Sequence, residues 1–443
     1  MAKNKVKPRI LTGFMELLPE DQILFNKIYD TIRQVYESFG FLPLDTPVIE
    51  LSEVLLAKAG GETEKQIYRF NKGDNDLALR FDLTVPLARY VAQHSGQLTF
   101  PFKRYQMSKV YRGERPQKGR FREFYQCDID IIGNEELDLC YDAEMPAVIY
   151  NVFRKLDFGK FTIHINNRKV LNGFFEGLGL EGQIADILRN IDKLDKIGKE
   201  NVISELKELG IDDERINKII DFITISGSNE DKIAALKAVD ADNEKFIEGV
   251  NELETVAGYM RAFGIDESYF DIDLKIARGL DYYTGTVYET TLDDYRGLGS
   301  VCSGGRYDNL TEYYTNTKLP GIGISIGLTR LFSQLKEAGI IESTRSSLVD
   351  VLVVPMGVDM GYVLKTANVI RQSGFVTDVY YTNKGMKQKM KYANKLGIPF
   401  VAVIGEDEVN SESVALKNMT TGEQVTVSLD DIISEIEKQI GDN

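Results

Sequence analysis

The chain has 443 residues, of which 43% are apolar and 27% are charged, and its formal net charge is −15. This composition predicts a soluble globular protein of roughly two to four domains, and no run approaches the ~18 apolar residues of a membrane span. The cysteines, Cys127, Cys140 and Cys302, lack metal-ligand spacing and cannot form a disulfide framework, which favours the cytoplasm. With only His94 and His164 present, a histidine base or histidine-rich metal site is poorly supported.

The N-terminal region predicts a helix, an extended segment and a hairpin. Apolar residues recur at three- and four-residue spacing over 20–39, between Pro19 and Gly40, which indicates an amphipathic helix. Prolines exclude a helix from the following segment, 41–50. Residues 60–80 contain two strand-like runs joined by a turn at 72–75, which predicts a β-hairpin.

Asp82 and Thr84 stand just before a predicted helix that runs through Tyr90. A carboxylate or hydroxyl at this position commonly caps the helix N-terminus. The same pair, two residues apart, could also hold a ligand's ammonium group. Both interpretations remain open from the residues alone.

A basic segment follows in this acidic chain. Eight Lys or Arg residues and only two acids lie between Lys103 and Glu123, where two strand-like runs, 105–112 and 121–132, flank a loop. An acidic protein binds nucleic acid only through such local patches. Arginine suits polyphosphate ligands because its planar fork binds two oxygens. A solvated, charge-rich edge is the alternative interpretation.

Two further features favour a ligand at this hairpin. Aromatic residues such as Phe124 alternate with the arginines and can stack on a base, while Glu114 can accept a hydrogen bond from an exocyclic amine. On the second strand, Gln126, Asp128 and Asp130 share one face because alternate residues of a strand point the same way.

The middle of the chain predicts a change of architecture. A helix is expected over 137–156 and a strand over 161–166. From 175 to 262 aromatic residues become fewer and apolar residues recur at helical spacing, which indicates a small helical insertion. That insertion either contacts a ligand or only packs against the rest of the protein.

Strands resume near residue 270, and three motifs follow. The sequence Arg-Gly-Leu-Asp-Tyr-Tyr occupies 278–283, and a strand is predicted over 286–292. Residues 303–308 contain a Gly-Gly pair, which is either an ordinary turn or a place of close backbone approach. Residues 321–335 predict a strand, a glycine break and a helix that begins near Arg330.

After a polar linker at 342–347, strands and helices alternate to the C-terminus. This order predicts an α/β unit on a mostly parallel sheet over 348–443.

These motifs resemble a known family. Residues 111–124 are similar to motif 2 of class II aminoacyl-tRNA synthetases, and 321–331 to motif 3, although the family often has Glu where Thr329 stands. Residues 278–283 and 303–308 resemble two motifs private to the histidyl-tRNA synthetases. The helix at 20–39 with its following strand resembles motif 1, which in that family forms a dimer interface.

The resemblance implies an α+β catalytic core on an antiparallel sheet, formed by residues 1–174 and 263–341. It further implies a helical insertion domain at 175–262, lying over the acceptor arm of tRNA, and an anticodon-binding domain at 348–443. By the same resemblance, the reaction joins histidine to ATP as an adenylate, with Mg²⁺ on the phosphates, and then transfers histidine to its tRNA. The partners implied are histidine, ATP, histidine tRNA and a second copy of the chain.

The resemblance also assigns residues to roles. The catalytic set is Arg112, Arg278 and Arg330. The histidine-binding set is Asp82, Thr84, Arg112, Gln126, Asp130, Arg278, Tyr282 and Tyr283. The ATP-binding set is Arg112, Glu114, Phe124 and Arg330. The candidates for contact with tRNA are Arg115, Gln117, Lys118 and Arg120. A non-catalytic, histidine-sensing regulatory paralogue of ATP phosphoribosyltransferase is the alternative function.

Overall fold

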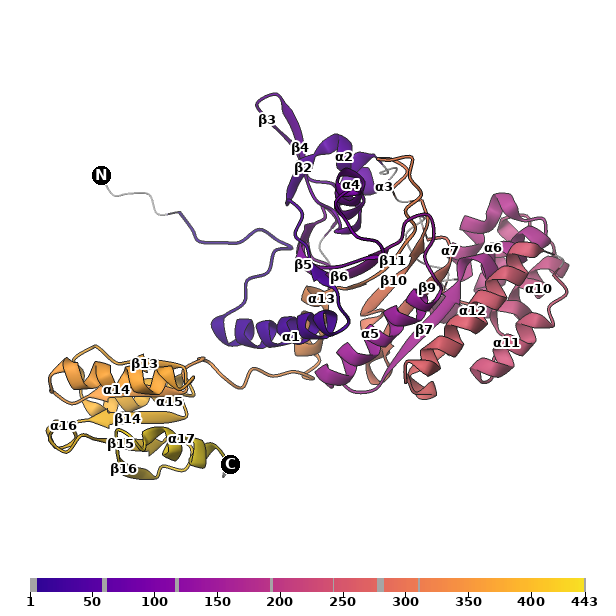
Figure 1. Cartoon of the computed structure of the whole chain (residues 1–443). Helices are drawn as coiled ribbons and strands as arrows, with labels where there is room; N and C mark the ends of the chain where they lie inside the picture. The colour runs from indigo at the N-terminus through magenta and orange to yellow at the C-terminus, as the bar shows by residue number, and fades with distance from the viewer. Residues whose placement is uncertain are drawn as a thin grey trace. The chain divides into compact units, whose positions relative to one another are not determined.

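The computed structural model describes residues 6–57, 62–115, 119–191, 194–241, 243–276, 283–309 and 311–441 (Figure 1). The largest element is an eight-stranded sheet in the order β1-β5-β6-β11-β10-β9-β7-β8. Its strands are β1 (Leu42–Pro43), β5 (Phe102–Tyr111), β6 (Glu123–Ile132), β7 (Phe161–Asn167), β8 (Phe270–Ile272), β9 (Thr286–Leu292), β10 (Cys302–Tyr307) and β11 (Gly321–Ile326). No helix among the described residues is long and apolar enough to span a membrane.

The expected antiparallel sheet is confirmed for its interior strands. All pairings from β5 to β7 are antiparallel, whereas the edge strands β1 and β8 pair in parallel with β5 and β7. The basic hairpin is the β5–β6 pair, held in register from Phe102 opposite Ile132 to Tyr111 opposite Glu123. The hairpin therefore lies inside the sheet, and the interpretation as a solvated edge is wrong for its strands.

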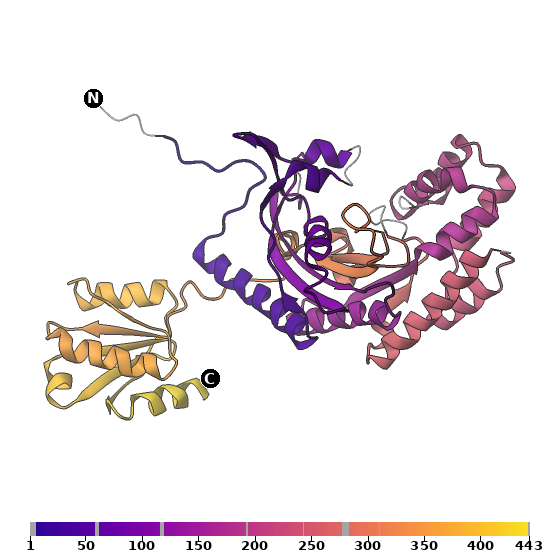
Figure 2. The same ribbon diagram turned by 45° about the horizontal axis from the view of Figure 1, so that its top comes forward.

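Helices cover one face of this sheet. The helix α1 (Pro19–Ser38) confirms the predicted amphipathic pattern, and from Ile28 onward its apolar stripe is buried. Two of its tyrosines tie it to the sheet: Tyr29 donates to the Met107 carbonyl at 3.1 Å and Tyr36 to the Cys127 carbonyl at 3.0 Å. The helix α5 (Cys140–Leu156) lies on the same face of the sheet as residues 28–38 of α1 (Figure 2).

A smaller sheet in the order β2-β4-β3 forms beside the first. The predicted hairpin is present, with Lys72 opposite Asn75 and a two-residue turn in which Gly73 has φ +59°, a conformation that glycine adopts without a steric cost. The elements here are β2 (Ile49–Leu51), α2 (Ser52–Leu56), α3 (Glu62–Gln66), β3 (Arg69–Lys72), β4 (Asn75–Leu79) and α4 (Thr84–His94).

The helical segment runs from Arg168 to Ala262 and starts earlier than residue 175. Its helices are α6 (Arg168–Gly177), α7 (Ile184–Ile191), α8 (Leu194–Ile197), α9 (Lys199–Glu208), α10 (Asp213–Ile223), α11 (Asn229–Lys237) and α12 (Glu244–Ala262). Helices α6 and α12 touch closely through two glycines: a Cβ on Gly173 would lie 2.4 Å from the Phe246 nitrogen, and one on Gly249 would lie 2.6 Å from the Val170 nitrogen. Larger side chains at these glycines would force the two helices apart.

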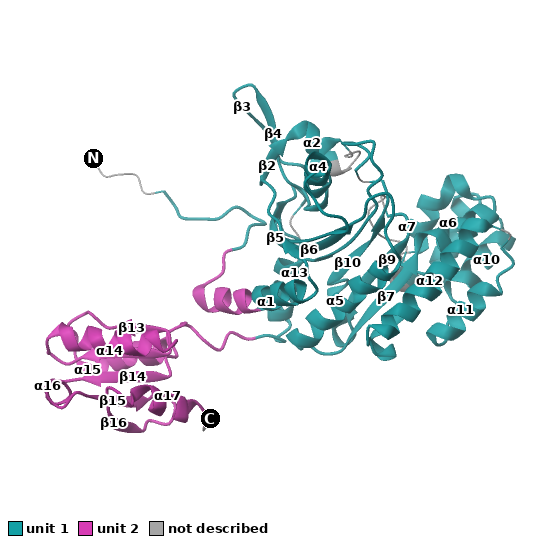
Figure 3. Cartoon of the chain, viewed as in Figure 1, with its two compact units in different colours: residues 1–15, 28–341 teal, residues 16–27, 342–443 magenta. Residues whose placement is uncertain are grey.

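By its contacts the chain divides into two compact units, residues 1–15 with 28–341 and residues 16–27 with 342–443 (Figure 3). The second unit contains a five-stranded sheet in the order β13-β12-β14-β15-β16. Its elements are β12 (Val351–Pro355), α14 (Met360–Gln372), β13 (Thr377–Val379), α15 (Met386–Lys395), β14 (Phe400–Ile404), α16 (Glu406–Asn410), β15 (Ser413–Asn418), β16 (Gln424–Ser428) and α17 (Ile432–Gly441).

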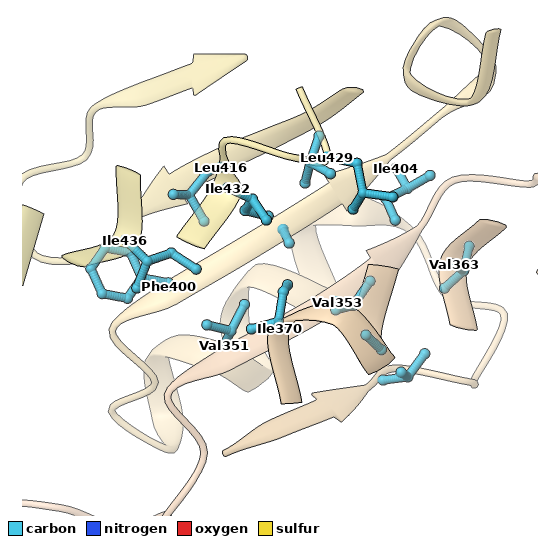
Figure 4. Packing of buried hydrophobic residues seen from close by; sticks show 14 residues of the cluster. Val351, Val353, Val363, Ile370, Phe400, Ile404, Leu416, Leu429, Ile432 and Ile436 are labelled. Carbon is cyan, nitrogen blue, oxygen red and sulfur yellow. The ribbon is translucent and has the colours of Figure 1, made fainter. Parts of the chain in front are cut away.

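The sheet of this unit is mixed, so the expectation of a mostly parallel sheet needs correction. Strands β13, β12 and β14 are parallel, but β15 and β16 add two antiparallel pairings. The connections into β15 and β16 are short, the first holding only the five-residue α16, and are too short for the crossover that a parallel pairing needs. Alternate residues of β12 and β14, among them Val351, Val353 and Phe400, meet Ile432 and Ile436 of α17 in one buried cluster (Figure 4). That cluster gives the unit its own core.

A buried ion pair in the first unit generates a stability prediction. Asp142, fully buried on α5, accepts from Nε of Arg306 on β10 at 3.1 Å through both oxygens, and Arg306 also donates to the Leu137 carbonyl at 3.0 Å. Removing one partner leaves a buried charge unpaired, so Asp142→Ala is expected to lower the free energy of unfolding by about 3–5 kcal/mol.

The control is Glu214→Ala, which breaks the exposed Lys218–Glu214 pair and is expected to cost at most about 0.5 kcal/mol. Urea-induced unfolding followed by circular dichroism measures both variants. Equal losses in the two would contradict the assigned importance of the buried pair.

Candidate active site

A cavity of about 520 Å³ lies among β6, β9, β10 and β11, the β5–β6 hairpin, the start of α4 and the helix α13 (Leu328–Glu337). Its size falls in the range of small-molecule and cofactor sites. It brings together most of the predicted site residues that the structure describes. Those that line it are Asp82, Thr84, Arg112, Glu114, Arg120, Phe124, Gln126, Asp130, Tyr283 and Arg330.

Some predicted residues are not among them. Arg278, Tyr282, Gln117 and Lys118 lie outside the described residues, so the expectations for them are untested. Arg115 is described but does not line the cavity.

The aspartates of β6 occupy one end of the cavity. Gln126, Asp128 and Asp130 all line it, as their two-residue spacing predicted. Asp130 is buried, and its oxygens are held by Nη2 of Arg104 at 2.6 Å and by the Tyr307 hydroxyl at 2.7 Å. Burial raises the pKa of Asp130, and the Arg104 guanidinium opposes that rise.

Asp82 caps a helix, which confirms one of the two interpretations that the sequence left open. Its Oδ1 accepts from the backbone N–H groups of Thr84 at 3.2 Å and Val85 at 2.9 Å, at the start of α4. Asp82 also lines the cavity, so the capping role does not exclude the binding role. Burial raises its pKa, while those backbone donors and Arg112 lower it.

Arg112 lines the cavity and contacts two aromatic rings. Its guanidinium lies 4.5 Å from the ring centroid of Phe81 and 5.0 Å from that of Phe124. Its Nε donates to the Phe81 carbonyl at 3.2 Å, and its Nη2 lies 3.5 Å from Oε1 of Gln126. Stacking between two rings orients the planar guanidinium before any ligand arrives.

The other end of the cavity is cationic. Arg330 donates from Nη2 to the Leu298 carbonyl at 2.9 Å, and its pKa is lowered by partial burial and by the nearby positive charge of Arg120. Arg120 in turn pairs with Glu114, Nη1 to Oε2 at 3.2 Å. Two neighbouring guanidiniums that both line a cavity favour an anionic ligand there.

Thr329 has a structural function that the sequence did not reveal. Its buried hydroxyl accepts from the backbone N–H of Tyr125 at 2.8 Å. This bond joins the first turn of α13, which carries Arg330, to the strand that carries Phe124 and Gln126. At a position where the related family often has Glu, this chain therefore has a short, neutral side chain whose hydrogen bond links α13 to β6.

The glycine pair of β10 is part of a strand, and its interpretation as an ordinary turn is wrong. A Cβ on Gly304 would lie 2.1 Å from the Gly323 carbonyl oxygen, and one on Gly305 would lie 3.0 Å from the Tyr283 ring. On β11, a Cβ on Gly323 would lie 2.1 Å from Oδ1 of Asp130. Glycine is thus required where Tyr283 and Asp130 pack against the sheet.

Several cavity residues were missed by sequence reasoning. Asp128 was placed on the correct face but given no role, and Tyr307 and Ser325 were not singled out; nor was Arg104, which does not line the cavity but pairs with Asp130 behind it. Ser325, opposite Asp128 in the β6–β11 register, accepts from Nε2 of Gln126 at 2.8 Å. The alternation of β6 was the available signal, but the partners come from strands distant in sequence.

The fold and the cavity define a class II aminoacyl-tRNA synthetase catalytic core, followed by a mixed α/β anticodon-binding domain. A family model described as histidyl-tRNA synthetase matches residues 13–331, and one described as an anticodon binding domain matches residues 350–439. The chain belongs to the histidyl-tRNA synthetase family.

Several histidine–tRNA ligases are similar to this chain over nearly its full length. A histidine–tRNA ligase of Clostridium tetani is 60% identical over 98% of this chain and 99% of its own, and one of Clostridium acetobutylicum is 49% identical over 97% and 100%. The crystal structure of histidyl-tRNA synthetase from Nostoc sp. PCC 7120 matches with a TM-score of 0.92 and 45% identity, covering 98% of this chain and 100% of that one.

The brace at Thr329 gives a prediction. Thr329→Val removes the acceptor of a buried N–H, so it is expected to lower the free energy of unfolding by about 1–3 kcal/mol. Thr329→Ser keeps a hydroxyl and serves as the matched control, with a smaller loss. Thermal unfolding by calorimetry measures both; if valine were tolerated as well as serine, the hydrogen bond would not brace the site.

Proposed function

We propose that the protein is a histidine–tRNA ligase that activates histidine with ATP in this cavity. The observation that carries the proposal is the arrangement of charge within one cavity, in a chain of this family: Asp82, Asp128 and Asp130 interact with one another, while Arg330 and Arg120 form a separate pair of neighbouring cations. An amino acid with a cationic ammonium group and a nucleotide with an anionic triphosphate require those two groups of charges. The histidine carboxylate attacks the α-phosphorus, its new O–P bond replaces the bond to pyrophosphate, and histidyl-adenylate results.

We assign ATP to the arginine end. Arg112 faces the α-phosphate, where charge builds during the attack, and Arg330 faces the γ-phosphate. Since phosphoryl transfer needs little covalent help from the protein, positioning and charge neutralisation carry the catalysis. Phe124 stacks on adenine and Glu114 accepts from its amine, with Arg120 orienting the Glu114 carboxylate.

Mg²⁺ is expected to accompany the phosphates of ATP, where it would neutralise part of their negative charge. The cavity lining fits a hard cation because two of its residues, Glu289 and Ser303, carry side-chain oxygens that could act as metal ligands. Glu289 on β9 and Ser303 on β10 are register partners and both line the cavity. We assign Glu289 as the carboxylate that would hold the ion or its waters.

Histidine takes the carboxylate end. Its ammonium group meets Asp82, Thr84 and Gln126, and its ring lies against Asp130 and Tyr283. Arg278 and Tyr282 belong to this set by resemblance, with Arg278 reaching the substrate carboxylate and the α-phosphate. Their roles stay predictions.

The second step moves histidine to the 3′ end of histidine tRNA. Arg115, Gln117, Lys118 and Arg120 of the hairpin loop are the candidates for contact with the acceptor end, and the unit from 348 to 443 for contact with the anticodon. We further propose a homodimer in the cytoplasm. Sedimentation of the purified protein tests the dimer, and fractionation of cells tests the location.

The alternative, a regulatory paralogue that only senses histidine, makes a different prediction for the same cavity. It would bind histidine without catalysing exchange between ATP and pyrophosphate. The presence of Arg112, Glu114 and Arg330 in one cavity, together with the match to an anticodon-binding domain, favours the ligase.

Pyrophosphate exchange across the twenty amino acids tests the proposed function. We expect exchange with histidine alone, dependent on Mg²⁺, followed by charging of histidine tRNA. Histidine binding without exchange in folded protein would support the regulatory paralogue instead. Exchange with a different amino acid would refute the assignment of the ring to the carboxylate end.

A variant of Arg330 tests the phosphate end. Arg330→Ala is expected to lower kcat/KM for exchange by about 10²–10³-fold, because a preorganised donor to the developing charge is lost. Arg330→Lys should be intermediate, since lysine keeps the charge but not the planar fork. The control, Arg189→Ala, removes an exposed arginine of α7, and a loss there as large as in Arg330→Ala would refute a specific role.

A further inference from the structure

Three side chains of metal-ligating type meet at one edge of the eight-stranded sheet, outside the active-site cavity. His164 is on β7, Asp271 is on the edge strand β8, and Asp273 follows that strand. One ligand atom from each of the three, a ring nitrogen or a carboxylate oxygen, lies within 4.8 Å of the other two. None of the three residues lines the cavity, so the roles assigned above leave this cluster unexplained.

The pairing of the two strands puts the three side chains on one face. Strands β7 and β8 are parallel, with His164 opposite Asp271. The pairing continues to Asp273, whose N–H donates to the Ile165 carbonyl at 3.0 Å, and two-residue spacing directs both aspartates to the same side. Oδ1 of Asp273 accepts from the Lys275 N–H at 3.0 Å, while Oδ2 lies 3.5 Å from Nδ1 of His164. The carboxylate is therefore oriented toward the ring by backbone contacts.

The ring of His164 has one satisfied and one unsatisfied nitrogen. Nε2 lies 3.1 Å from the Thr291 hydroxyl on β9, whereas the buried Nδ1 has no hydrogen-bond partner among the residues that the structure describes. In the tautomer that donates from Nε2 to Thr291, Nδ1 turns a lone pair toward the Asp273 carboxylate. In the other tautomer, Nδ1–H is too far from Oδ2 for a good hydrogen bond. A cation bound by both groups removes this conflict.

The charges and the exposure of the cluster are compatible with an ion from solvent. Lys232 on α11 pairs with Oδ1 of Asp271 and donates to the Ile272 carbonyl at 2.8 Å, and a carboxylate has a second oxygen for another partner. Burial lowers the pKa of His164, although Asp273 and Asp271 raise it. The side chains of His164, Asp273 and Asp271 are 22%, 18% and 39% exposed, so the site is open on one side.

We propose that His164, Asp271 and Asp273 bind a divalent transition-metal ion such as Zn²⁺, with water completing its coordination. One imidazole nitrogen and two carboxylate oxygens are ligands that Zn²⁺ accepts, at about 2.0–2.2 Å. Thr291 holds the second ring nitrogen, as the outer partners of metal-bound histidines do. Mg²⁺ prefers oxygen ligands alone. The site is separate from any Mg²⁺ that accompanies ATP and does not depend on the proposed function.

A metal ion at this place would fasten the edge of the sheet. Strand β8 has only three residues and pairs with β7 alone, while the proposed ligands come from both sides of that pairing. Because the ion binds the folded site and not the separated strands, it is expected to stabilise the fold. The chain continues from β8 to the motif at 278–283, so the ion would anchor the segment that precedes this motif in sequence.

The experiment is a calorimetric titration of the full, EDTA-treated and dialysed chain with ZnCl₂. The variants are His164→Gln, Asp273→Asn and, as the matched control, His94→Gln, which removes the other histidine of the chain on α4. The asparagine keeps an oxygen for the Lys275 N–H and removes the carboxylate. Thermal unfolding with EDTA and with Zn²⁺ accompanies each titration.

We expect the wild type and His94→Gln to bind one Zn²⁺ with equal affinity. Loss of an outer partner typically weakens metal binding by about 10–100-fold, so loss of a direct ligand in His164→Gln or Asp273→Asn should weaken it by at least about 100-fold. Zn²⁺ should raise the melting temperature of the wild type and of His94→Gln only. Excess Mg²⁺ should not displace the bound Zn²⁺.

The opposite results overturn the proposal. They are no binding by the wild type, unchanged binding by His164→Gln, or an equal loss in His94→Gln. If His164→Gln melts below the wild type in EDTA, Asp273→Asn decides: binding lost at an unchanged melting temperature supports the site, and binding retained refutes it. Displacement by Mg²⁺ would refute the choice of a transition metal. No measurement here involves pyrophosphate exchange, so this proposal and the proposed function fail separately.

Discussion

The buried guanidinium of Arg104 is the interaction on which the candidate site depends. It is fully buried between the sheet and the start of α4, pairs with Asp130 at 2.6 Å and donates to the Leu83 carbonyl at 3.1 Å. Asp82, Asp128 and Asp130 interact with one another at this end of the cavity, and Arg104 offsets part of their repulsion. Without a cation beneath them, three neighbouring carboxylates could remain buried only by taking up protons.

Close backbone packing gives the same end of the cavity its shape. Gly304 lets β10 lie against the backbone of β11, and Gly323 lets β11 lie against the Asp130 side chain. Asp130 occupies space that any larger residue at 323 would take. The glycines, the buried arginine and Tyr307 therefore form one unit. The cavity is formed by the packing of the sheet, and its polar side chains are held by partners that are themselves buried.

Local sequence patterns predicted the features that depend on residues close together in the chain, namely helices, hairpins and the faces of strands. Helical spacing located α1, the runs around 113–122 located the hairpin, and two-residue alternation placed Gln126, Asp128 and Asp130 on one face. The motifs located Arg112 and Arg330. Local patterns could not predict the partners of Asp130, which the fold brings together. Arg104 lies opposite it on the preceding strand, β5, and Tyr307 lies 177 positions further along the chain. Strand direction was not predictable from local pattern either: β1 and β8 pair in parallel at the edges of the first sheet, and β15 and β16 pair antiparallel in the second.

The hydrogen bond from Tyr125 to Thr329 spans 204 positions of the chain. It links the strand that carries Phe124 and Gln126 to the helical turn that carries Arg330, so cavity-lining groups of two distant segments are held together. The entropy of assembling them is lost when the chain folds, before any ligand is bound. Because the donor is a backbone N–H, every residue except proline can supply it at position 125, whereas the acceptor depends on the side chain at 329. The constraint on sequence therefore falls on the helix and not on the strand.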